Sequence, residues 1–311
     1  MIGVCCQWLE SVQRPRSGDY HYVNAVDEHS LQLGRYAAGK YTPEHIRSTY
    51  LHNVNNLIRM LPRISQSGIR LFRISSSLFP LADKVDKVHW DNDVIRTQLK
   101  RVGDLVKSLQ IRVTTHPGQF CVLSSDSDRV VENSFNELAL HGWIFDVMGL
   151  DHSPHYAINI HGGKSDRSSR LIEQIKSLPQ SVRSRLTLEN DESAYSLIDL
   201  LGIHKETNVP VVWDSHHHTF NDDGVSMNDA YTLSRLTWPT GVTPLQHISN
   251  TEPSSKGGSF TERRKHSNMI HYIPDAQLQG LRDGTIACEI EAKMKNIAVD
   301  SMVNMFSLTR L

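Results

Sequence analysis

The sequence predicts an α/β protein built as a single (β/α)8, or TIM, barrel over residues 1–311. Eight short apolar runs rich in β-branched residues recur along the chain, and amphipathic segments with helical spacing separate them. The runs are nearly continuous, which is typical of parallel strands covered on both faces. An open, doubly wound sheet is the main alternative. No Gly-x-Gly-x-x-Gly or Gly-x-x-x-x-Gly-Lys-Ser/Thr sequence follows a run, so the usual reason to prefer that fold is missing.

The expected strands and helices alternate along the chain. The strand candidates are residues 2–8, 69–75, 111–116, 156–161, 185–190, 209–214, 244–249 and 285–291. Apolar positions three and four residues apart predict helices around 46–61, 95–109, 131–148 and 171–178, and further helices near 194–207, 226–236 and 293–308. Two connections are long, 9–45 and 250–272, and both would open on the face where barrel enzymes place their sites.

Composition and charge narrow the class of protein. The chain carries 33 Lys and Arg against 34 Asp and Glu, which excludes a generally basic nucleic-acid coat protein but not a local basic groove. No run of about 18 apolar residues is present, so a membrane span is excluded, and the start MIGVCCQWLE does not read as a secretory signal. The four cysteines form no Cys-x-x-Cys pair, which favours free thiols in a reducing compartment. A cytoplasmic protein is therefore expected.

Histidine is frequent, at 17 residues, and His, Asp or Glu residues stand where the later strands end. Because the carboxyl ends of barrel strands converge on one mouth, these side chains are expected to meet there. They are His116, His161, Glu189 and Asp214 at the ends of strand candidates three to six, His247 within the seventh, and Glu289 and Glu291 at the end of the eighth. His216, His217 and His218 follow Asp214 directly, and His266 lies in the loop after the seventh strand.

Each of these residues alone has an ordinary structural explanation, such as a hydrogen bond or a salt bridge. Their coincidence on six consecutive strands favours a multinuclear metal centre, because carboxylates gathered in one cavity repel one another and lose hydration unless cations compensate. Imidazole and carboxylate ligands without thiolate favour Zn²⁺, Mn²⁺ or Fe. Such a centre suits hydrolysis of a phosphodiester, and it also suits a sugar isomerase in which metal ions hold an ene-diol.

Five strings give the sequence a resemblance to a known family. FRISSSLFP at 72–80, HPGQF at 116–120, ENDE at 189–192, DSHHH at 214–218 and EAKMK at 291–295 resemble the UV damage endonuclease family, in family order and over about residues 1–296. That family is similar in turn to endonuclease IV, a barrel enzyme that cuts DNA at abasic sites. The resemblance implies a (β/α)8 barrel with two or three divalent ions, manganese first, with Zn²⁺, Co²⁺ or Mg²⁺ as alternatives.

The resemblance also implies an activity and a set of site residues. The enzyme would act as a monomer on damaged double-stranded DNA. It would cut immediately 5′ of a pyrimidine dimer or a (6-4) photoproduct, leaving a 3′-hydroxyl and a 5′-phosphate. The implied ligands are His116, His161 and Glu189 for one ion, Glu189, Asp214, His247 and Glu291 for a second, and His217 and His266 for a third, with Glu189, Asp214 and Glu291 as catalytic residues. Spacing alone leaves Glu289 open against Glu291, and His216 or His218 against His217.

A second implied set would contact DNA. Gln119 and Phe120 match the pair with which the family is thought to probe the lesion. An apolar wedge replaces lost stacking while the amide occupies the vacated pairing edge. The alternative for Phe120 is packing in the barrel rim. The loop at 256–265 carries Lys256, Arg263 and Arg264, which are expected either to contact phosphates or to be solvated.

The sequence departs from the family pattern at three places. Leu245 stands where family members carry a lysine that completes the third metal site, so this site is expected to bind weakly, to be empty, or to use water or Gln246 instead. Val4 stands where the family has a second probing aromatic residue, a role that Trp8 could take. His266 is followed by Ser and Asn in place of a His-x-Asp sequence.

Three classes of function remain. A metal-dependent endonuclease acting on UV photoproducts leads, with an endonuclease directed at abasic sites as its close alternative. A sugar-phosphate isomerase or epimerase would instead need a small closed pocket, and it would leave HPGQF without a role. A non-catalytic DNA-binding relic is disfavoured because the ligand set for two metal ions is complete.

Overall fold

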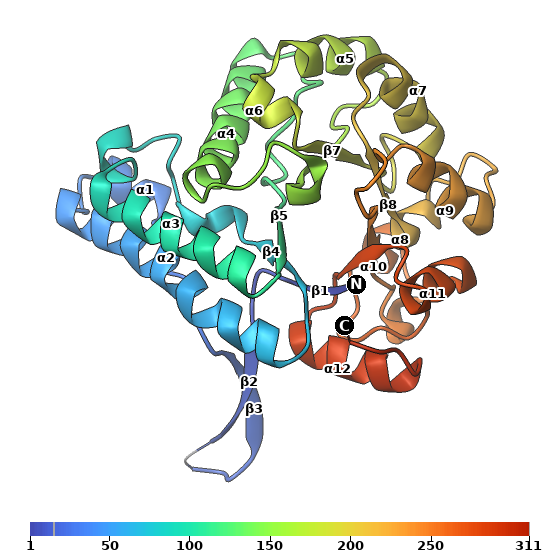
Figure 1. Cartoon of the computed structure of the whole chain (residues 1–311), viewed down its shortest axis with the longest axis horizontal. Coiled ribbons are helices and arrows are strands. Elements are labelled where there is room, and N and C mark those ends of the chain that lie inside the picture. Colours follow the sequence, from blue (N-terminus) through green and yellow to red (C-terminus); the bar gives the residue numbers. More distant parts are fainter. Residues whose placement is uncertain (15, 311) are drawn as a thin grey trace.

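The computed structural model describes residues 1–14 and 16–310. Its barrel strands are β1 (Ile2–Cys5), β4 (Leu71–Ile74), β5 (Arg112–Thr115), β6 (Ile158–His161), β7 (Leu186–Glu189), β8 (Val211–Asp214), β9 (Leu245–Ile248) and β10 (Ala287–Ile290). They close into a parallel barrel in the spatial order β1-β10-β9-β8-β7-β6-β5-β4, and helices surround it (Figure 1). The predicted (β/α)8 architecture is therefore confirmed.

Each barrel strand lies within the run predicted for it and is shorter than that run. Every residue of β4, β5, β7, β8, β9 and β10 is buried, which explains why these runs contain so few exposed polar positions. The first run, 2–8, ends at Cys5. The next residue, Cys6, has a φ of 66°, and an extended strand cannot continue through this left-handed conformation.

Helices follow the strands where the apolar spacing predicts them. The longest is α2 (Pro43–Gln66), and it begins where the Thr42 hydroxyl accepts the backbone N–H of His45. The others are α1 (Leu33–Ala37), α3 (Asp93–Ser108), α4 (Asp128–Val147), α5 (Ser168–Ser177), α6 (Gln180–Arg183), α7 (Leu197–Thr207), α8 (Ser215–His218), α9 (Met227–Leu236), α10 (Phe260–Arg263), α11 (Asp275–Arg282) and α12 (Lys295–Met305). Among the described helices, none combines the length and the apolar character that crossing a membrane requires.

The long connection at 9–45 contains an element that the sequence did not reveal. Two antiparallel strands, β2 (Leu9–Gln13) and β3 (Tyr20–Asn24), form a hairpin that projects from the barrel (Figure 1). The Leu9 N–H donates to the side chain of Asn296 in α12, which fixes the base of the hairpin. Most of its residues are exposed, so the sequence lacks the alternation of apolar and polar positions that marks a half-buried strand.

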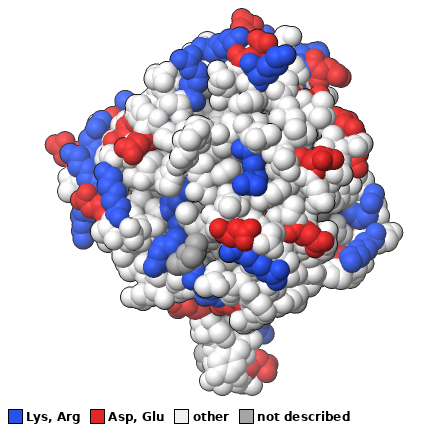
Figure 2. Space-filling model, turned by 45° about the vertical axis from the view of Figure 1, so that its right-hand side comes forward, with Lys and Arg blue, Asp and Glu red and all other residues white. Residues whose placement is uncertain are grey.

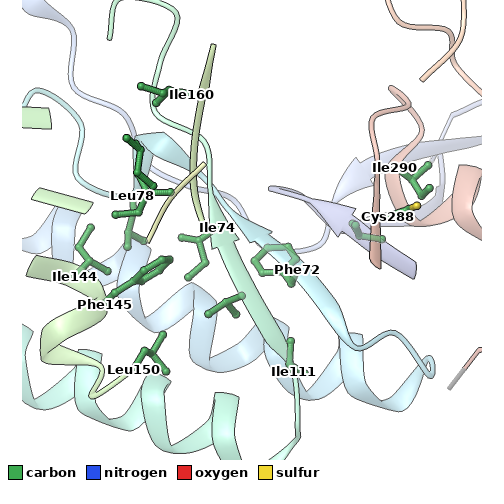
Figure 3. Close-up of a cluster of buried hydrophobic side chains, with 14 of the residues drawn as sticks. Phe72, Ile74, Leu78, Ile111, Ile144, Phe145, Leu150, Ile160, Cys288 and Ile290 are labelled. Carbon is green, nitrogen blue, oxygen red and sulfur yellow. The ribbon is translucent and has the colours of Figure 1, made fainter. Parts of the chain in front are cut away.

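The larger part of the core lies between the barrel strands and the helices. It includes Phe72 and Ile74 of β4 and Ile144 and Phe145 of α4 (Figure 3). Phe72 and Ile74 lie on the outward face of β4, toward α4, since neighbouring residues in a strand point to opposite sides. The inward face is therefore left to Leu71, Arg73 and the other residues that line the barrel.

A smaller apolar cluster fills the amino-terminal end of the barrel. It consists of Leu71, Ala157, Val212, Trp238, Leu245 and Ala287. Arg112, at the start of β5, is buried beside it and donates to the backbone carbonyls of His155 and Thr243, both at 2.7 Å. The barrel is thus filled at this end, and the polar side chains lie toward the carboxyl ends of the strands.

Candidate metal centre

Glu189, the last residue of β7, lies at the centre of the barrel mouth. Its Oε2 is 3.1 Å from Nε2 of His116, and its Oε1 is 3.0 Å from Nδ1 of His247. Three groups of side chains each place one ligand atom per residue within 4.8 Å of one another. The first is His116, His161 and Glu189, the second is Glu189, Asp214, His247 and Glu291, and the last is Cys5, Glu289 and Glu291. Glu189 belongs to the first and second groups, so one carboxylate joins them.

The Glu189 carboxylate is held from the side of β6. The Asn159 amide donates to Glu189 Oε2 at 2.6 Å, and the Thr187 hydroxyl donates to Asn159 Oδ1 at 2.8 Å. Burial alone would raise the pKa of Glu189, but the imidazoles of His247 and His161 hold the pKa well below its usual value. The carboxylate is therefore ionised in a position where only a few oriented dipoles and imidazoles solvate it.

Within the first and second groups, two ligand-type atoms have no partner among the described residues. Asp214 uses Oδ1 to accept the backbone N–H groups of His216 and His217, at 2.6 and 2.8 Å, and so starts the short helix α8. Its Oδ2 is buried and makes no hydrogen bond, and the same is true of Nδ1 of His161. A buried carboxylate oxygen without a donor is costly unless a cation or water approaches it.

The structure distinguishes the three consecutive histidines that the sequence could not. His216 contacts the Thr251 hydroxyl through Nε2 at 2.9 Å, and His218 donates toward the carbonyl of Val225 at 2.9 Å. His217 instead faces the mouth, with Nδ1 3.0 Å from the carbonyl of Asn190 and 3.4 Å from Oε1 of Glu189.

The charge around His217 is strongly negative. Burial alone would lower the pKa of His217, but Asp214 and Glu189 raise the pKa to about 9. The protein without cations therefore carries a proton on His217 at neutral pH, in a place where the surrounding carboxylates favour positive charge.

Glu289 of β10 and Glu291, which follows this strand, occupy different levels. Glu291 lies in the second group at the mouth, whereas Glu289 lies deeper in the barrel, where it accepts a hydrogen bond from the Thr114 hydroxyl. The guanidinium of Arg73 in β4 forms ion pairs with both carboxylates. Burial acts to raise the pKa of Glu291, but Arg73 and His247 hold it well below its usual value.

Arg73 is the site residue that sequence reasoning missed. It lies in the string FRISSSLFP, which carried part of the family resemblance, but no role was assigned to it. An arginine within an otherwise apolar run was the available signal, because a buried guanidinium needs paired acidic partners. Its partner Glu289 is 216 positions away in the sequence, so the pair was not visible from spacing.

His266 lies at the edge of the site. Its Nε2 is 3.5 Å from Oε2 of Glu291, and the centre of its ring is 6.2 Å from that of His217. Of the third metal site that the family resemblance implies, His217 and His266 lie near each other, and no candidate group among the described residues contains either of them. Leu245 is fully buried in the apolar cluster at the other end of the barrel.

The alternative that Gln246 replaces the missing ligand is wrong. Its side chain donates to the Ser234 hydroxyl at 3.3 Å and accepts from the Gln277 amide at 3.1 Å. These partners belong to α9 and α11, outside the barrel. Alternation along β9 explains the outcome, because Gln246 points away from the interior that Leu245 and His247 face.

The residues expected to probe DNA lie on an exposed loop after β5. Phe120 is 78% exposed, so it does not pack in the rim as the alternative required, and Gln119 beside it is also exposed. The loop is fixed by Glu137 of α4, whose carboxylate accepts the Gly118 N–H at 2.7 Å. Val4 is fully buried, and Trp8, the aromatic residue considered in its place, is partly buried against the core. Neither is exposed in the way that Phe120 is.

The basic residues of the 256–265 loop have mixed surroundings. Arg264 forms an ion pair with Glu192 at 2.6 Å, and the guanidinium of Arg263 lies 5.5 Å from the centre of the Phe220 ring. Lys256 and Arg263 line a cleft beside His216. Figure 2 shows basic and acidic side chains interspersed over the face that it displays, in keeping with a net charge of −1.

The closed parallel barrel and the groups of histidines and carboxylates at its mouth define a (β/α)8 protein with a candidate metal centre at the carboxyl ends of its strands. The chain belongs to the UV-endonuclease UvdE family, whose profile matches residues 21–310. A UV DNA damage endonuclease of Nostoc sp. is 39% identical over 260 residues, which are 82% of this chain and 77% of that protein. The predicted family resemblance is therefore confirmed.

Similarity to solved structures agrees with this assignment. The crystal structure of SacUVDE aligns with 99% of both chains, at a TM-score of 0.79 and 27% identity. Endonuclease IV from Thermus thermophilus aligns with 81% of this chain and 94% of its own, at a TM-score of 0.57 and 13% identity. The second likeness shows a shared fold alone.

Proposed function

We propose that this chain is a metal-dependent DNA repair endonuclease that cuts the phosphodiester bond immediately 5′ of UV photoproducts, leaving a 3′-hydroxyl and a 5′-phosphate. Membership of the UvdE family and the relatives named UV DNA damage endonuclease support the substrate. The observation that carries the proposal is Glu189, a buried carboxylate that joins two groups of ligand-type side chains. Paired metal sites of this kind suit in-line displacement at a phosphodiester.

The residues at the mouth fit divalent cations. The first group would hold one ion through His116, His161 and Glu189, and the second would hold another through Glu189, Asp214, His247 and Glu291. The unpartnered Oδ2 of Asp214 and Nδ1 of His161 support this fit. Burial lowers the pKa of His161, which favours the neutral imidazole that a ligand requires.

The donor set is one of nitrogen and oxygen. Cys5 lies near Glu289 and Glu291, and burial raises the pKa of its thiol well above the usual value. The two groups that Glu189 joins contain no thiol. Histidine and carboxylate ligands suit Mn²⁺, with Zn²⁺, Co²⁺ or Mg²⁺ as alternatives. We propose two firmly held ions, with weaker binding at a third place near His217 and His266, because Leu245 supplies no ligand there.

The side chains of the protein would take separate roles in catalysis and in DNA binding. When bound, the ions supply Lewis acidity and neutralise the charge of the phosphodiester. Glu189, Asp214 and Glu291 would be the catalytic residues, since they would hold the ions. Phe120 would enter the duplex as an apolar wedge and Gln119 would occupy the vacated pairing edge, at a step that the lesion has already weakened. Lys256, Arg263 and Arg264 would contact phosphates.

The test is incubation of a UV-irradiated duplex, labelled at one 5′ end, with the full chain and Mn²⁺. We expect one nick per photoproduct, on its 5′ side, and no nick in an unirradiated duplex of the same sequence. A duplex with a single abasic site distinguishes the endonuclease IV-like alternative. An intact irradiated duplex, with turnover of a small sugar or sugar phosphate instead, would contradict the proposal. The exposed Phe120 speaks against that outcome, because a sugar pocket gives it no role.

A further inference from the structure

His247 lies among three carboxylates, two on the Nδ1 side of its ring and one on the Nε2 side. Nδ1 is 3.0 Å from Oε1 of Glu189 and 3.5 Å from Oε1 of Glu291, both in the second group at the mouth. Nε2 is 3.1 Å from Oε2 of Glu289, deeper in the barrel. His247 and Glu289 are buried and stand opposite each other in the register of β9 and β10. The sheet itself therefore fixes which ring nitrogen faces the mouth.

Glu289 is held so that it faces His247 rather than the mouth. Its Oε1 accepts from the Thr114 hydroxyl of β5, and its Oε2 accepts from the Arg73 guanidinium of β4. Arg73 neutralises the charge of Glu289 and also reaches Glu291. Contacts from three strands thus orient a carboxylate that belongs to neither the first nor the second group of candidate ligands.

We propose that Glu289 is a positioning residue for the metal centre. Its carboxylate accepts the Nε2–H of His247, which leaves Nδ1 of His247 unprotonated and directed toward the second group. Histidine ligands of metals commonly donate their second ring N–H to a carboxylate, which fixes the tautomer and orients the ring. The inference rests on the proposed metal centre and adds to it a residue that does not touch the ions.

One further contact bears on the tautomer. Nη2 of Arg73 lies 3.0 Å from Nε2 of His247, and a guanidinium can only donate. If Arg73 controlled the ring, Nε2 would accept and Nδ1 would carry the proton, pointing at Glu189. Glu289 and Arg73 therefore favour opposite tautomers, and the proton position on His247 decides between them.

The first experiment measures metal binding without DNA. Mn²⁺ is titrated calorimetrically into the chelator-treated full chain, for the wild type and for Glu289→Gln. We expect one of the two firm binding steps, that of the second group, to lose about 10- to 100-fold in affinity, which is the usual cost of removing such a supporting group. Unchanged affinity in both steps would overturn the proposal.

Two comparisons separate positioning from packing. His247→Ala removes the ring on which Glu289 acts, so adding Glu289→Gln to it should cost no further affinity. Losses that add in the double variant would overturn the inference. Thr114→Val removes the hydrogen bond from Thr114 to Glu289 and keeps the contacts of Glu289 with Arg73 and His247, so a smaller loss is expected. A loss equal to that of Glu289→Gln would indicate a packing role and would also overturn it.

A measurement on the wild type covers the case in which Glu289→Gln does not fold. Nitrogen-15 spectra of the histidine rings in the Zn²⁺-loaded protein report the tautomer of His247. A proton on Nε2 with a coordinated Nδ1 supports the inference, and a proton on Nδ1 overturns it. A wild type that binds metal but leaves photoproducts intact would contradict only the proposed function, because none of these measurements uses DNA.

Discussion

Oε1 of Glu189 lies 3.0 Å from Nδ1 of His247, although the two residues come from strands that are separated by β8 in the barrel. The other oxygen of Glu189 lies 3.1 Å from Nε2 of His116, on the opposite side. One carboxylate therefore bridges two groups of candidate ligands, and its removal affects both at once.

Glu189→Gln should abolish incision of a UV-irradiated duplex. An amide carries no negative charge and offers a single acceptor oxygen, so it cannot serve two cations. Replacement of a supporting group already costs about 10- to 100-fold, and we expect loss of the shared ligand to cost more. Incision rate and metal content are measured on the same preparation. Glu173→Gln, at an exposed carboxylate of α5, is the control, and equal rates for the two variants would contradict the bridging role.

Phe120→Ala should weaken binding to a photoproduct-containing duplex while leaving the metal content unchanged. Stacking of an aromatic side chain on a base is worth about 1–3 kcal/mol, which corresponds to roughly 5- to 150-fold in affinity. Fluorescence anisotropy with damaged and undamaged duplexes measures the difference. Equal losses of metal and of DNA binding would indicate that Phe120 supports the rim of the barrel instead.

The chain should retain two equivalents of divalent metal after dialysis. Leu245 belongs to the apolar cluster at the closed end of the barrel, so it gives no ligand to a third ion near His217 and His266. Elemental analysis of the purified protein counts the ions. Treatment with a chelator should stop incision, and added Mn²⁺ should restore it. Three firmly held equivalents would show that the inference from Leu245 is wrong.

Stability should fall in mild acid because of His141. This residue of α4 is buried, with Nδ1 3.1 Å from the Thr115 hydroxyl. Burial, with a smaller contribution from His116, lowers its pKa from 6.5 to about 4. Between these two values the unfolded chain binds more protons than the folded chain, so acid favours unfolding, and the stabilisation is complete only above the unfolded pKa.

The comparison of wild type with His141→Gln isolates this effect. The difference in unfolding free energy between them should shrink by about 2 kcal/mol between roughly pH 7 and pH 5. Urea denaturation of chelator-treated protein measures it, because bound metal would add its own pH dependence. If the difference in unfolding free energy is the same at pH 7 and pH 5, His141 has the same pKa in the folded and unfolded states.

The fold could be predicted because buried strands require apolar residues, and these appear as short apolar runs in the sequence. Residues of β8 such as Val211 and Trp213 are apolar because helices cover the outside of the barrel, and Asp214 marks the strand end because that end is polar. The hairpin β2–β3 was missed because its two strands bury almost nothing. Its exposed Tyr20 and Tyr22 do not produce the pattern from which strands are inferred.

The candidate site was predictable only in part, for a different reason. Alternation along a strand places Glu289 and Glu291 on the same side, so their different depths depend on the register between β10 and β9. Likewise, the choice among His216, His217 and His218 depends on the turn that Asp214 starts by accepting two backbone N–H groups. The role of Arg73 becomes visible only when the barrel closes and β4 and β10 come to lie on either side of β1.

The filled amino-terminal end of the barrel has a consequence for the order of events. Leu245, Trp238 and their neighbours fill that end, so ions and nucleic acid both reach Glu189 through the mouth at the carboxyl ends of the strands. A bound duplex would cover this mouth and prevent ions that are already bound from leaving. Protein charged with Mn²⁺ before mixing should therefore cut in its first turnover, whereas metal-free protein mixed first with DNA should show a lag set by departure of the duplex.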